Sequence, residues 1–484
     1  MRIRSSIFCL DSQEEAQAYV DRYKQSVLAD GSKVVAERVN FAPQPQSSMS
    51  VIDQHTGYVK AIVGGRGEKT ASLTLNRATD TTRQPGSTFK VVSTYAPALN
   101  EKGMTLATTF EDEPYNYPDG SPVENASRTY GGTTTIRRAI QNSINVVAVK
   151  CLEEVTPELG LQYLDNFGFT TLAHGTEADT DANGTVWTDA NLPLALGGLT
   201  HGVTNVELCA AYAAIANQGN YIEPLYYTKI LDHNGNVLIE KTSAERSVIK
   251  ESTAWLLTSA MEDVVKSGTG TACQLDNMTV AGKTGTTDDY NDLWFVGYTP
   301  YYTCAVWSGF DNNEKLPDDY SRDFHKDMWR KVMTRIHEGL EDKDFEMPST
   351  VEKISVCADT GLLPRSGCSV ITEFFDVGDV PTDYCEEHFY EPEPVIPEYT
   401  YDETIIPEPS LTPENPDENG DQGDGNTDNG DAGGEGNGGD DTGSGDTGGG
   451  DTGDGDTGGG DVGGGDTDGG DTGGGDAGGG EIIE

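Results

Sequence analysis

The sequence has little positive charge and no long hydrophobic run. Lys and Arg total 32 against 81 Asp and Glu, which gives a formal net charge of −49. Nucleic-acid binding depends on Lys and Arg contacts to phosphates, so this imbalance excludes that function. No run of 18 apolar residues is present, and Met1 to Leu10 is too short and too weakly apolar for a signal peptide. We therefore expect no segment of this sequence to span a bilayer.

The acidic residues are concentrated at the C-terminal end. Residues 401–484 contain 30 of the 59 glycines and 24 carboxylates, but no Lys, Arg or Cys. The final stretch repeats Asp-x-Gly-Gly-Gly every five residues, without the aliphatic position of a calcium-binding β-roll. Too few apolar side chains are available to offset the entropy of ordering the backbone. A disordered, acidic, Gly-rich tail is therefore predicted over 393–484.

The rest of the chain is long enough to bury a core. Residues 12–30 place apolar side chains at helical spacing after Ser12, and a Pro-rich break follows at 42–46, so 1–44 is predicted to be an N-terminal helix and linker. A β-hairpin, a mainly helical stretch, another helix and a three-strand meander follow, at 48–65, 84–218, 251–268 and 278–310. The first strands must return to pair with the last. This predicts an α+β domain over 45–340, with one antiparallel sheet flanked by helices.

The eight cysteines divide into two groups. The first five are far apart in the sequence and are predicted to be small buried hydrophobes; they are Cys9, Cys151, Cys209, Cys273 and Cys304. The last three precede a histidine in a predicted small accessory module over 345–392; these four are Cys357, Cys368, Cys385 and His388. They could ligate zinc, although the gaps of 10 and 16 residues lack a C-x-x-C pair. A disulfide with one thiol left over explains the same residues, so both hypotheses remain open.

A serine and a lysine three residues apart form the first candidate catalytic site. Ser87 and Lys90 follow Pro85-Gly86, which marks a helix start, and they would lie on one face of its first turn. A lysine kept neutral by burial and nearby cations can remove the serine proton. N–H groups at the helix N-terminus can stabilise an oxyanion. The pattern therefore favours a serine nucleophile.

Ser-x-x-Lys alone is a weak signal, because the chain contains a second copy. Ser247 and Lys250 belong to a polar, strand-like segment before another helix and are interpreted as structural. A Lys-Ser-Gly sequence at 266–268 ends a helix, so its glycine is interpreted as a C-cap.

Two further motifs distinguish the first copy. Ser143 and Asn145 form Ser-x-Asn ahead of an apolar helical run, and Lys-Thr-Gly-Thr at 283–286 ends an apolar strand. Ser-x-x-Lys, Ser-x-Asn and Lys-Thr-Gly in this order are the signature of penicillin-binding proteins and class A β-lactamases. The chain resembles the transpeptidase domain of class A penicillin-binding proteins, within the penicillin-binding and serine β-lactamase-like superfamily. The other matching stretches are SVIDQHTGYVKAIVGG, LNRATDTTRQPGSTFK, LALGGLTHGV, TVAGKTGTTDDYNDLWFVGYTP and AVWSGFDN.

The resemblance implies a D,D-transpeptidase that cross-links peptidoglycan stem peptides through a serine acyl-enzyme, without a cofactor. Ser87 is implied to attack the penultimate D-Ala carbonyl of a D-Ala-D-Ala donor, with Lys90 as general base. Ser143 is implied to bridge Lys90 and Lys283 and to pass a proton to the leaving amine. The implied substrate-binding residues are Asn145, Lys283, Thr284, Gly285 and Thr286. The implied oxyanion hole consists of the backbone N–H groups of Ser87 and Thr286, and β-lactams are implied to acylate Ser87.

Three alternatives compete with this prediction. A D,D-carboxypeptidase would use water in place of the amine acceptor. A class A β-lactamase would need a Glu that activates the deacylating water, but Glu153 and Glu154 lie in a predicted continuous helix. A non-catalytic wall-binding protein could retain the fold, yet all the motif side chains are present.

The resemblance also predicts where the protein works. Class A members carry a membrane anchor and a glycosyltransferase domain before the transpeptidase domain, and neither is recognisable in this sequence. We expect the full-length protein to include both, and to face the cell wall outside the membrane of a Gram-positive bacterium.

Overall fold

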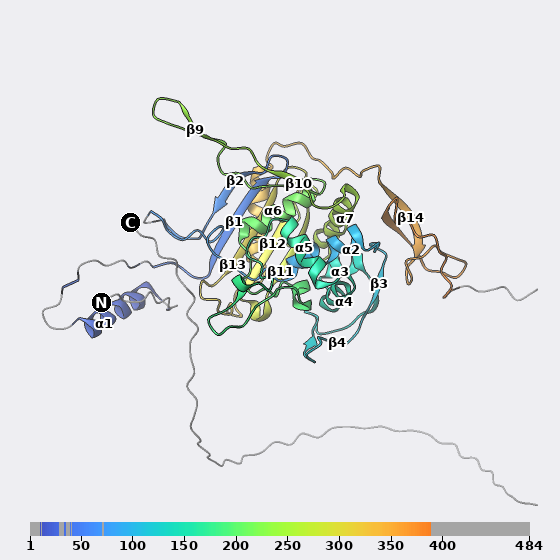
Figure 1. Cartoon of the computed structure of the whole chain (residues 1–484), viewed down its shortest axis with the longest axis horizontal. Helices are drawn as coiled ribbons and strands as arrows, with labels where there is room; N and C mark the ends of the chain where they lie inside the picture. Colours follow the sequence, from blue (N-terminus) through green and yellow to red (C-terminus); the bar gives the residue numbers. More distant parts are fainter. Residues whose placement is uncertain are drawn as a thin grey trace, which may run out of the picture. The chain divides into compact units, whose positions relative to one another are not determined.

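The computed structural model describes residues 10, 12–28, 33–34, 39, 41–69 and 72–388 (Figure 1). All of these residues belong to the first of the two units into which the chain divides, 1–396 and 397–484. The predicted disordered tail and Cys9 lie outside the described residues.

A five-stranded antiparallel sheet forms the centre of the fold (Figure 1). Its strands are β1 (Gln46–Asp53), β2 (Tyr58–Val63), β11 (Ala281–Thr286), β12 (Asp292–Tyr298) and β13 (Thr303–Gly309). Their order is β11-β12-β13-β1-β2, so the N-terminal hairpin pairs with the C-terminal meander, with Val51 opposite Cys304. The predicted hairpin, meander and α+β class are therefore confirmed. Strand β11, which carries Lys-Thr-Gly-Thr, lies at an edge of the sheet.

The sheet separates two hydrophobic cores, because its pleat sends alternate side chains to opposite faces. Trp294 and Trp307 pack on one face in the larger core, which includes helix α6 (Asn205–Ala216). Phe295 packs on the other face against Trp329 of helix α8 (Phe324–Ile336), with ring centroids 5.0 Å apart. Both faces of the sheet are thus covered by helices.

Helix α6 consists mostly of small residues, which allows its backbone to lie close to the sheet. The Cys209 thiol donates hydrogen bonds to the carbonyls of Ser50 and Thr303, at 3.5 Å each. Cys151, Cys273 and Cys304 are also buried. The prediction of buried small hydrophobes is confirmed for these four cysteines.

The segment between the hairpin and the meander is mainly helical, as expected. Its helices are η1 (Gly86–Thr88), η2 (Lys90–Tyr95), α2 (Ala96–Glu101), α3 (Ile136–Asn142), α4 (Asn145–Val155), α5 (Pro157–Asn166), η3 (Glu177–Asp179), η4 (Leu192–Leu196), α6, α7 (Glu251–Ser267) and η5 (Thr271–Cys273). The polar stretch at 111–133 contributes to two ribbons, β3 (Thr109–Asp112) with β6 (Gly132–Thr135) and β4 (Tyr115–Asn116) with β5 (Pro122–Val123). Two further ribbons pair β7 (Asn220–Ile222) with β10 (Glu245–Ser247) and β8 (Lys229–Leu231) with β9 (Val237–Glu240). The turn η6 (Asp288–Tyr290) connects β11 to β12.

Helix α1 (Gln13–Val27) confirms the helix predicted near the N-terminus. Ser12 caps it by accepting a hydrogen bond from the backbone N–H of Glu15. Among the described residues, no helix is both long enough and apolar enough to cross a membrane.

The C-terminal part of the described chain is a hairpin of β14 (Val351–Cys357) and β15 (Val370–Asp376). Its own core is small: Val356 and Phe375 pack with Ala107, which belongs to the preceding domain. Arg137 of α3 forms ion pairs with Glu373 of β15 at 2.6 Å and with Asp263 of α7 at 2.7 Å. Glu373 is only 3% exposed. The hairpin is therefore joined to the preceding part of the chain by apolar contacts with Ala107 and by charged contacts with Arg137 of α3.

The second core predicts a measurable stability difference between two methionines. Met333 of α8 is fully buried in that core, whereas Met347 is 48% exposed. Met333→Ala should lower the free energy of unfolding by about 2–5 kcal/mol, because it removes buried methylene groups and leaves a cavity. Met347→Ala should change it by less than about 0.5 kcal/mol. Urea titration of both variants measures this difference, and equal effects would contradict the described packing of α8.

Candidate active site

Ser87 lies in the short turn η1, at the edge of a cavity of about 560 Å³. Gly86 has a φ of +57°, and a Cβ at this position would lie 2.8 Å from the carbonyl oxygen of Thr286. The Gly197 backbone also lies close, because a Cβ on Gly197 would lie 2.5 Å from the Gly86 carbonyl oxygen. Only glycine fits such close backbone contacts. They hold the Ser87 turn between the end of β11 and the loop after η4.

The helix predicted at this point begins as expected but is not a regular α-helix. Turn η1 leads into the π-helix η2, which Lys90 begins. Single π-helical turns occur frequently at functional sites. Lys90 is fully buried, and its Nζ donates to Ser143 O at 2.7 Å, to Asn145 Oδ1 at 2.5 Å and to Ser143 Oγ at 3.3 Å. Burial, and secondarily the charge of Lys283, holds the Lys90 pKa well below the ordinary lysine value.

Ser143 ends helix α3 in a left-handed conformation, with φ 56° and ψ 43°. This conformation is unfavourable for a residue with a Cβ, and such strained residues cluster at functional sites. Ser143 Oγ accepts a hydrogen bond from Lys283 Nζ at 2.7 Å as well as the bond from Lys90. Lys283 is fully buried, and burial lowers its pKa to about 7. One hydroxyl therefore lies between two buried lysine side chains.

Asn145 is the first residue of α4, and its position depends on an asparagine that the sequence did not single out. Ile144, the N-cap residue, has no polar side chain to cap the helix. Asn125 Oδ1 instead accepts from the backbone N–H of Asn145 at 3.0 Å and of Val146 at 3.2 Å. Asn125 Nδ2 donates to Asp112 Oδ1 at 2.7 Å, which fixes the amide. A loop residue substitutes for the missing cap.

The strand with Lys-Thr-Gly-Thr presses directly on the Ser87 turn. A Cβ at Gly285 would lie 2.5 Å from the carbonyl oxygen of Pro85, so glycine is required here as well. Thr286 is exposed and lines the cavity. The Thr284 hydroxyl is hydrogen-bonded to Thr269 Oγ1 at 2.7 Å. Thr269 directly follows the Lys-Ser-Gly sequence at 266–268, for which the sequence predicts only a helix end.

The structure thus brings the three motifs together, with Ser87, Asn145 and Thr286 lining the cavity. The motifs did not identify the aromatic side chains of Tyr117 and Trp187, which line it too. These two come from loops whose composition carries no signal specific to an active site.

The residues of the second Ser-x-x-Lys copy and of the β-lactamase alternative lie outside this cavity. Ser247 and Lys250 are exposed, at the end of β10 and just before α7, and neither lines the cavity. Glu153 and Glu154 are exposed on helix α4, where Glu153 accepts a hydrogen bond from the Tyr115 hydroxyl at 2.6 Å. Neither glutamate lines the cavity that contains Ser87, so the geometry does not favour the β-lactamase alternative.

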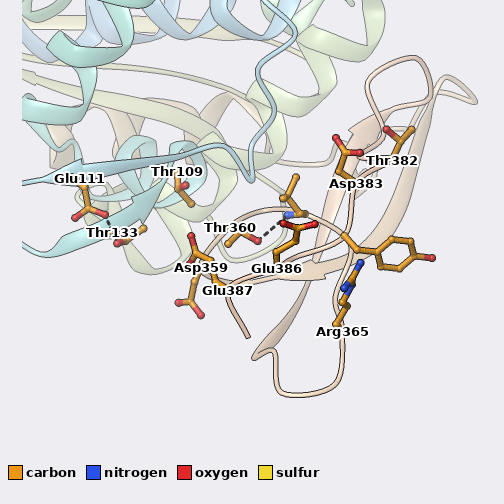
Figure 2. Close-up of a pocket in the computed structure, with 12 residues that line it drawn as sticks. Thr109, Glu111, Thr133, Asp359, Thr360, Arg365, Thr382, Asp383, Glu386 and Glu387 are labelled. Atoms are coloured by element: carbon orange, nitrogen blue, oxygen red, sulfur yellow. Dashed lines mark hydrogen bonds between the residues drawn. The ribbon is translucent and has the colours of Figure 1, made fainter. Parts of the chain in front are cut away.

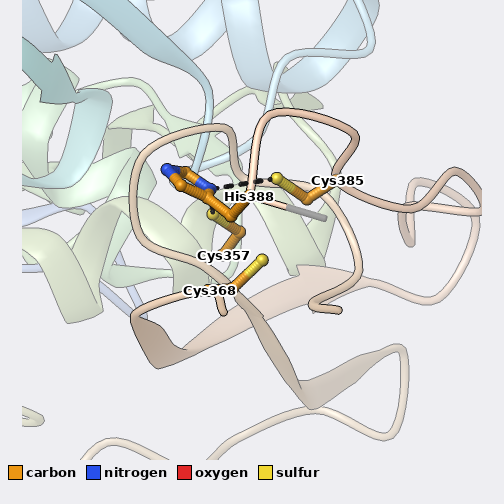
Figure 3. Close-up of side chains that lie close together, drawn as sticks. All are labelled: Cys357, Cys368, Cys385 and His388. Carbon is orange, nitrogen blue, oxygen red and sulfur yellow. Dashed lines mark hydrogen bonds between the residues drawn. The ribbon is translucent and has the colours of Figure 1, made fainter. Parts of the chain in front are cut away.

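Two features lie outside this cavity. A hollow of about 770 Å³ between the β3–β6 ribbon and the loops of the C-terminal hairpin contains none of the motif residues (Figure 2). The structure also brings Cys357, Cys368, Cys385 and His388 together, with their donor atoms all within 4.8 Å of one another (Figure 3).

Comparisons with known proteins agree with this geometry. The penicillin-binding protein transpeptidase domain matches residues 48–334, and the C-terminal domain of penicillin-binding protein 1A matches residues 347–390. Penicillin-binding protein 1A of Clostridium botulinum (strain Langeland) is 34% identical over 382 residues, which are 75% of this chain and 44% of the relative. The chain therefore spans less than half the length of this relative.

Solved structures show the same fold. Penicillin-binding protein 1A of Haemophilus influenzae has a TM-score of 0.60 at 23% identity, covering 72% of this chain and 55% of the other. PonA1 of Mycobacterium tuberculosis, solved in complex with penicillin V, has a TM-score of 0.55 at 25% identity, covering 70% of this chain and 86% of the other. The match of the transpeptidase domain to more than half of the sequence decides the family. The chain therefore belongs to the penicillin-binding proteins and carries their transpeptidase domain, of the serine acyltransferase and peptidase type.

Proposed function

We propose that this domain is a D,D-transpeptidase that cross-links peptidoglycan stem peptides, and that β-lactams inhibit it by acylating Ser87. The observation that carries the proposal is the position of Ser143 Oγ between Lys90 Nζ and Lys283 Nζ. Lys90 also donates to Asn145, which lines the cavity together with Ser87. Two lysines with lowered pKa values, joined through a hydroxyl, can accept a proton and return it.

Acylation requires a proton to leave Ser87 as its Oγ attacks the carbonyl carbon of the penultimate D-Ala. Neutral Lys90 takes that proton, since burial disfavours its charged form. The carbonyl oxygen gains negative charge and is stabilised by the backbone N–H groups of Ser87 and Thr286, whose chain segments lie in contact. Each such donor contributes roughly a factor of 10²–10³ to the rate.

The tetrahedral intermediate then loses its C–N bond. The leaving D-Ala amine takes a proton relayed through Ser143, and an ester remains on Ser87. An acceptor amine attacks this ester in the second half-reaction and forms the cross-link, which frees Ser87 again. Lys90 takes the proton lost by the acceptor and passes it to the Ser87 oxygen as the ester bond breaks, so the serine hydroxyl and the neutral lysine are both restored.

Donor binding follows from the edge position of β11. The backbone of an edge strand has unpaired hydrogen-bonding groups, so an extended stem peptide can align along it. We assign the Asn145 side chain to the donor's amide, and Lys283, Thr284, Gly285 and Thr286 to the site of the terminal carboxylate. Because stem peptides lie outside the cytoplasmic membrane, the domain acts on the wall-facing side.

The first test replaces the nucleophile. Ser87→Ala should abolish covalent labelling by a fluorescent penicillin while leaving the thermal midpoint unchanged, because a half-buried hydroxyl contributes little to packing. Ser247→Ala, in the second Ser-x-x-Lys copy, is the matched control and should be labelled like the wild type. Labelling of Ser87→Ala would refute the assignment of the nucleophile.

The second test concerns the base. Since the lowered Lys90 pKa makes the neutral amine available, the acylation rate should rise with pH and level off well below a free lysine's pKa of about 10.4. Lys90→Arg retains the charge but cannot deprotonate, so acylation should fall by at least about 10²-fold. Lys250→Arg is the control and should retain the wild-type pH profile. A fully active Lys90→Arg enzyme would assign the base elsewhere.

The third test separates cross-linking from hydrolysis. A peptide ending in D-Ala-D-Ala is incubated with the protein, with and without an amine acceptor, and the products are identified by mass spectrometry. A transpeptidase should form the amide-linked product at the expense of the hydrolysed one as acceptor concentration rises. Hydrolysis unaffected by the acceptor would instead make the domain a D,D-carboxypeptidase.

A further inference from the structure

Four potential metal ligands from three segments of the chain meet in the C-terminal hairpin module. Cys357 ends β14, Cys368 lies in the loop that leads to β15, and Cys385 and His388 lie in the segment after β15. Figure 3 shows their side chains converging on a common centre, and the donor atoms lie within 4.8 Å of one another. His388 Nδ1 is 3.3 Å from Cys385 Sγ and 3.5 Å from Cys357 Sγ.

The two nitrogen–sulfur distances are close to the corresponding edge of a zinc tetrahedron. With Zn–S bonds of about 2.3 Å and Zn–N bonds of about 2.0–2.1 Å, tetrahedral angles place sulfur about 3.6 Å from nitrogen and about 3.8 Å from another sulfur. The donors are three thiols and one imidazole, a set typical of structural zinc sites. We propose that Cys357, Cys368, Cys385 and His388 bind a structural zinc ion.

The surroundings of the cluster fit this assignment. His388 Nε2, the ring nitrogen not facing the sulfurs, lies 3.4 Å from Asp359 Oδ2. A carboxylate at this position fixes the orientation of a zinc-bound imidazole. The backbone N–H of Arg365 donates to Cys368 Sγ at 3.3 Å, which stabilises negative charge on that sulfur.

Backbone hydrogen bonds hold the ligand loops in register. The N–H of Cys385 donates to Leu363 O at 2.8 Å, and the N–H of Cys357 donates to Leu362 O at the same distance. The segments that carry Cys357 and Cys385 are therefore tied to the same two-residue stretch.

A disulfide explains the arrangement less well. Bonding two sulfurs at about 2.0 Å would leave the third thiol and His388 converging on the bond without a role. All seven cysteines among the described residues are free thiols. Zinc coordination accounts for all four side chains at once.

The proposed metal has a structural purpose. The hairpin core has three buried members, Val356, Phe375 and Ala107, with Ile354, Ile371 and Val380 partly buried against them. So small an apolar core stabilises the module weakly. Four protein ligands fill every position of a tetrahedral zinc ion, whereas a catalytic zinc keeps one position open for water or substrate. The proposed role of the metal is therefore structural. Zinc would hold the segment after β15 against the hairpin.

Metal analysis of the full chain tests the proposal. The protein is reduced, stripped of metal, given zinc and freed from excess by gel filtration, and its zinc is measured by mass spectrometry. We expect about one zinc per chain, and less than a tenth of that in His388→Ala and in Cys385→Ser. Cys273→Ser alters a buried thiol outside the cluster and should retain the full amount. Zinc-free wild type, or equal zinc in all four proteins, would overturn the proposal.

Cobalt substitution provides a measurement that does not depend on the variants folding. Co²⁺ added to the stripped wild-type protein should produce thiolate-to-metal charge-transfer bands and the intense visible bands of a tetrahedral site. Weak bands typical of six-coordinate cobalt would contradict the geometry.

Alkylation without prior reduction is the third readout. A disulfide among the three cysteines in the protein as isolated would also overturn the proposal.

Discussion

Two lysine side chains buried next to each other are the constraint on which the rest of this structure depends. Removing an ammonium group from water is costly, and placing a second one nearby adds repulsion. Both costs are reduced when the lysines lose their protons, which is the direction of both pKa shifts. The fold must hold Lys90 and Lys283 where neither can reach solvent, and it must supply acceptors for their remaining hydrogen bonds. Ser143 meets the second requirement for both lysines.

Many distant parts of the chain contribute to this arrangement. Ser143 can point between the lysines because α3 ends in a left-handed residue, and Asn145 can face Lys90 because Asn125 caps α4 from a loop. Glycines allow the Ser87 turn, the end of β11 and the loop after η4 to touch through their backbones. The Ser87 hydroxyl is therefore positioned by backbone contacts, whereas Lys90 and Lys283 are positioned by burial.

Sequence alone predicted one antiparallel sheet in which the first strands pair with the last, because strand periodicity is a local signal. It also singled out the three motifs, because their residues are close together and in a recognisable order along the chain. It did not predict Asn125 or Thr269, since their roles depend on loops that meet only in three dimensions. The interpretation of Gly268 as the C-cap of α7 is confirmed, although its φ of −104° is not the left-handed conformation common at that position. Glycine is needed there because a Cβ would lie 2.3 Å from Gln141 O. In the cysteine cluster, the closely spaced pair is Cys385-x-x-His388, which a pattern of cysteine spacings alone does not reveal.

Arg137 connects the C-terminal hairpin to the helix that Ser143 ends. Its guanidinium is paired with Glu373 of the hairpin and Asp263 of α7, with Glu373 almost fully enclosed. Separating the hairpin would break the ion pair between Arg137 and Glu373 and its two charge-assisted hydrogen bonds, and this cost opposes its independent opening. The ion pairs of Arg137 link the hairpin to α3 and α7, and we expect the amide protons of these elements to exchange with solvent through a shared opening. We therefore expect unfolding to cross the boundary between the two matched sequence families.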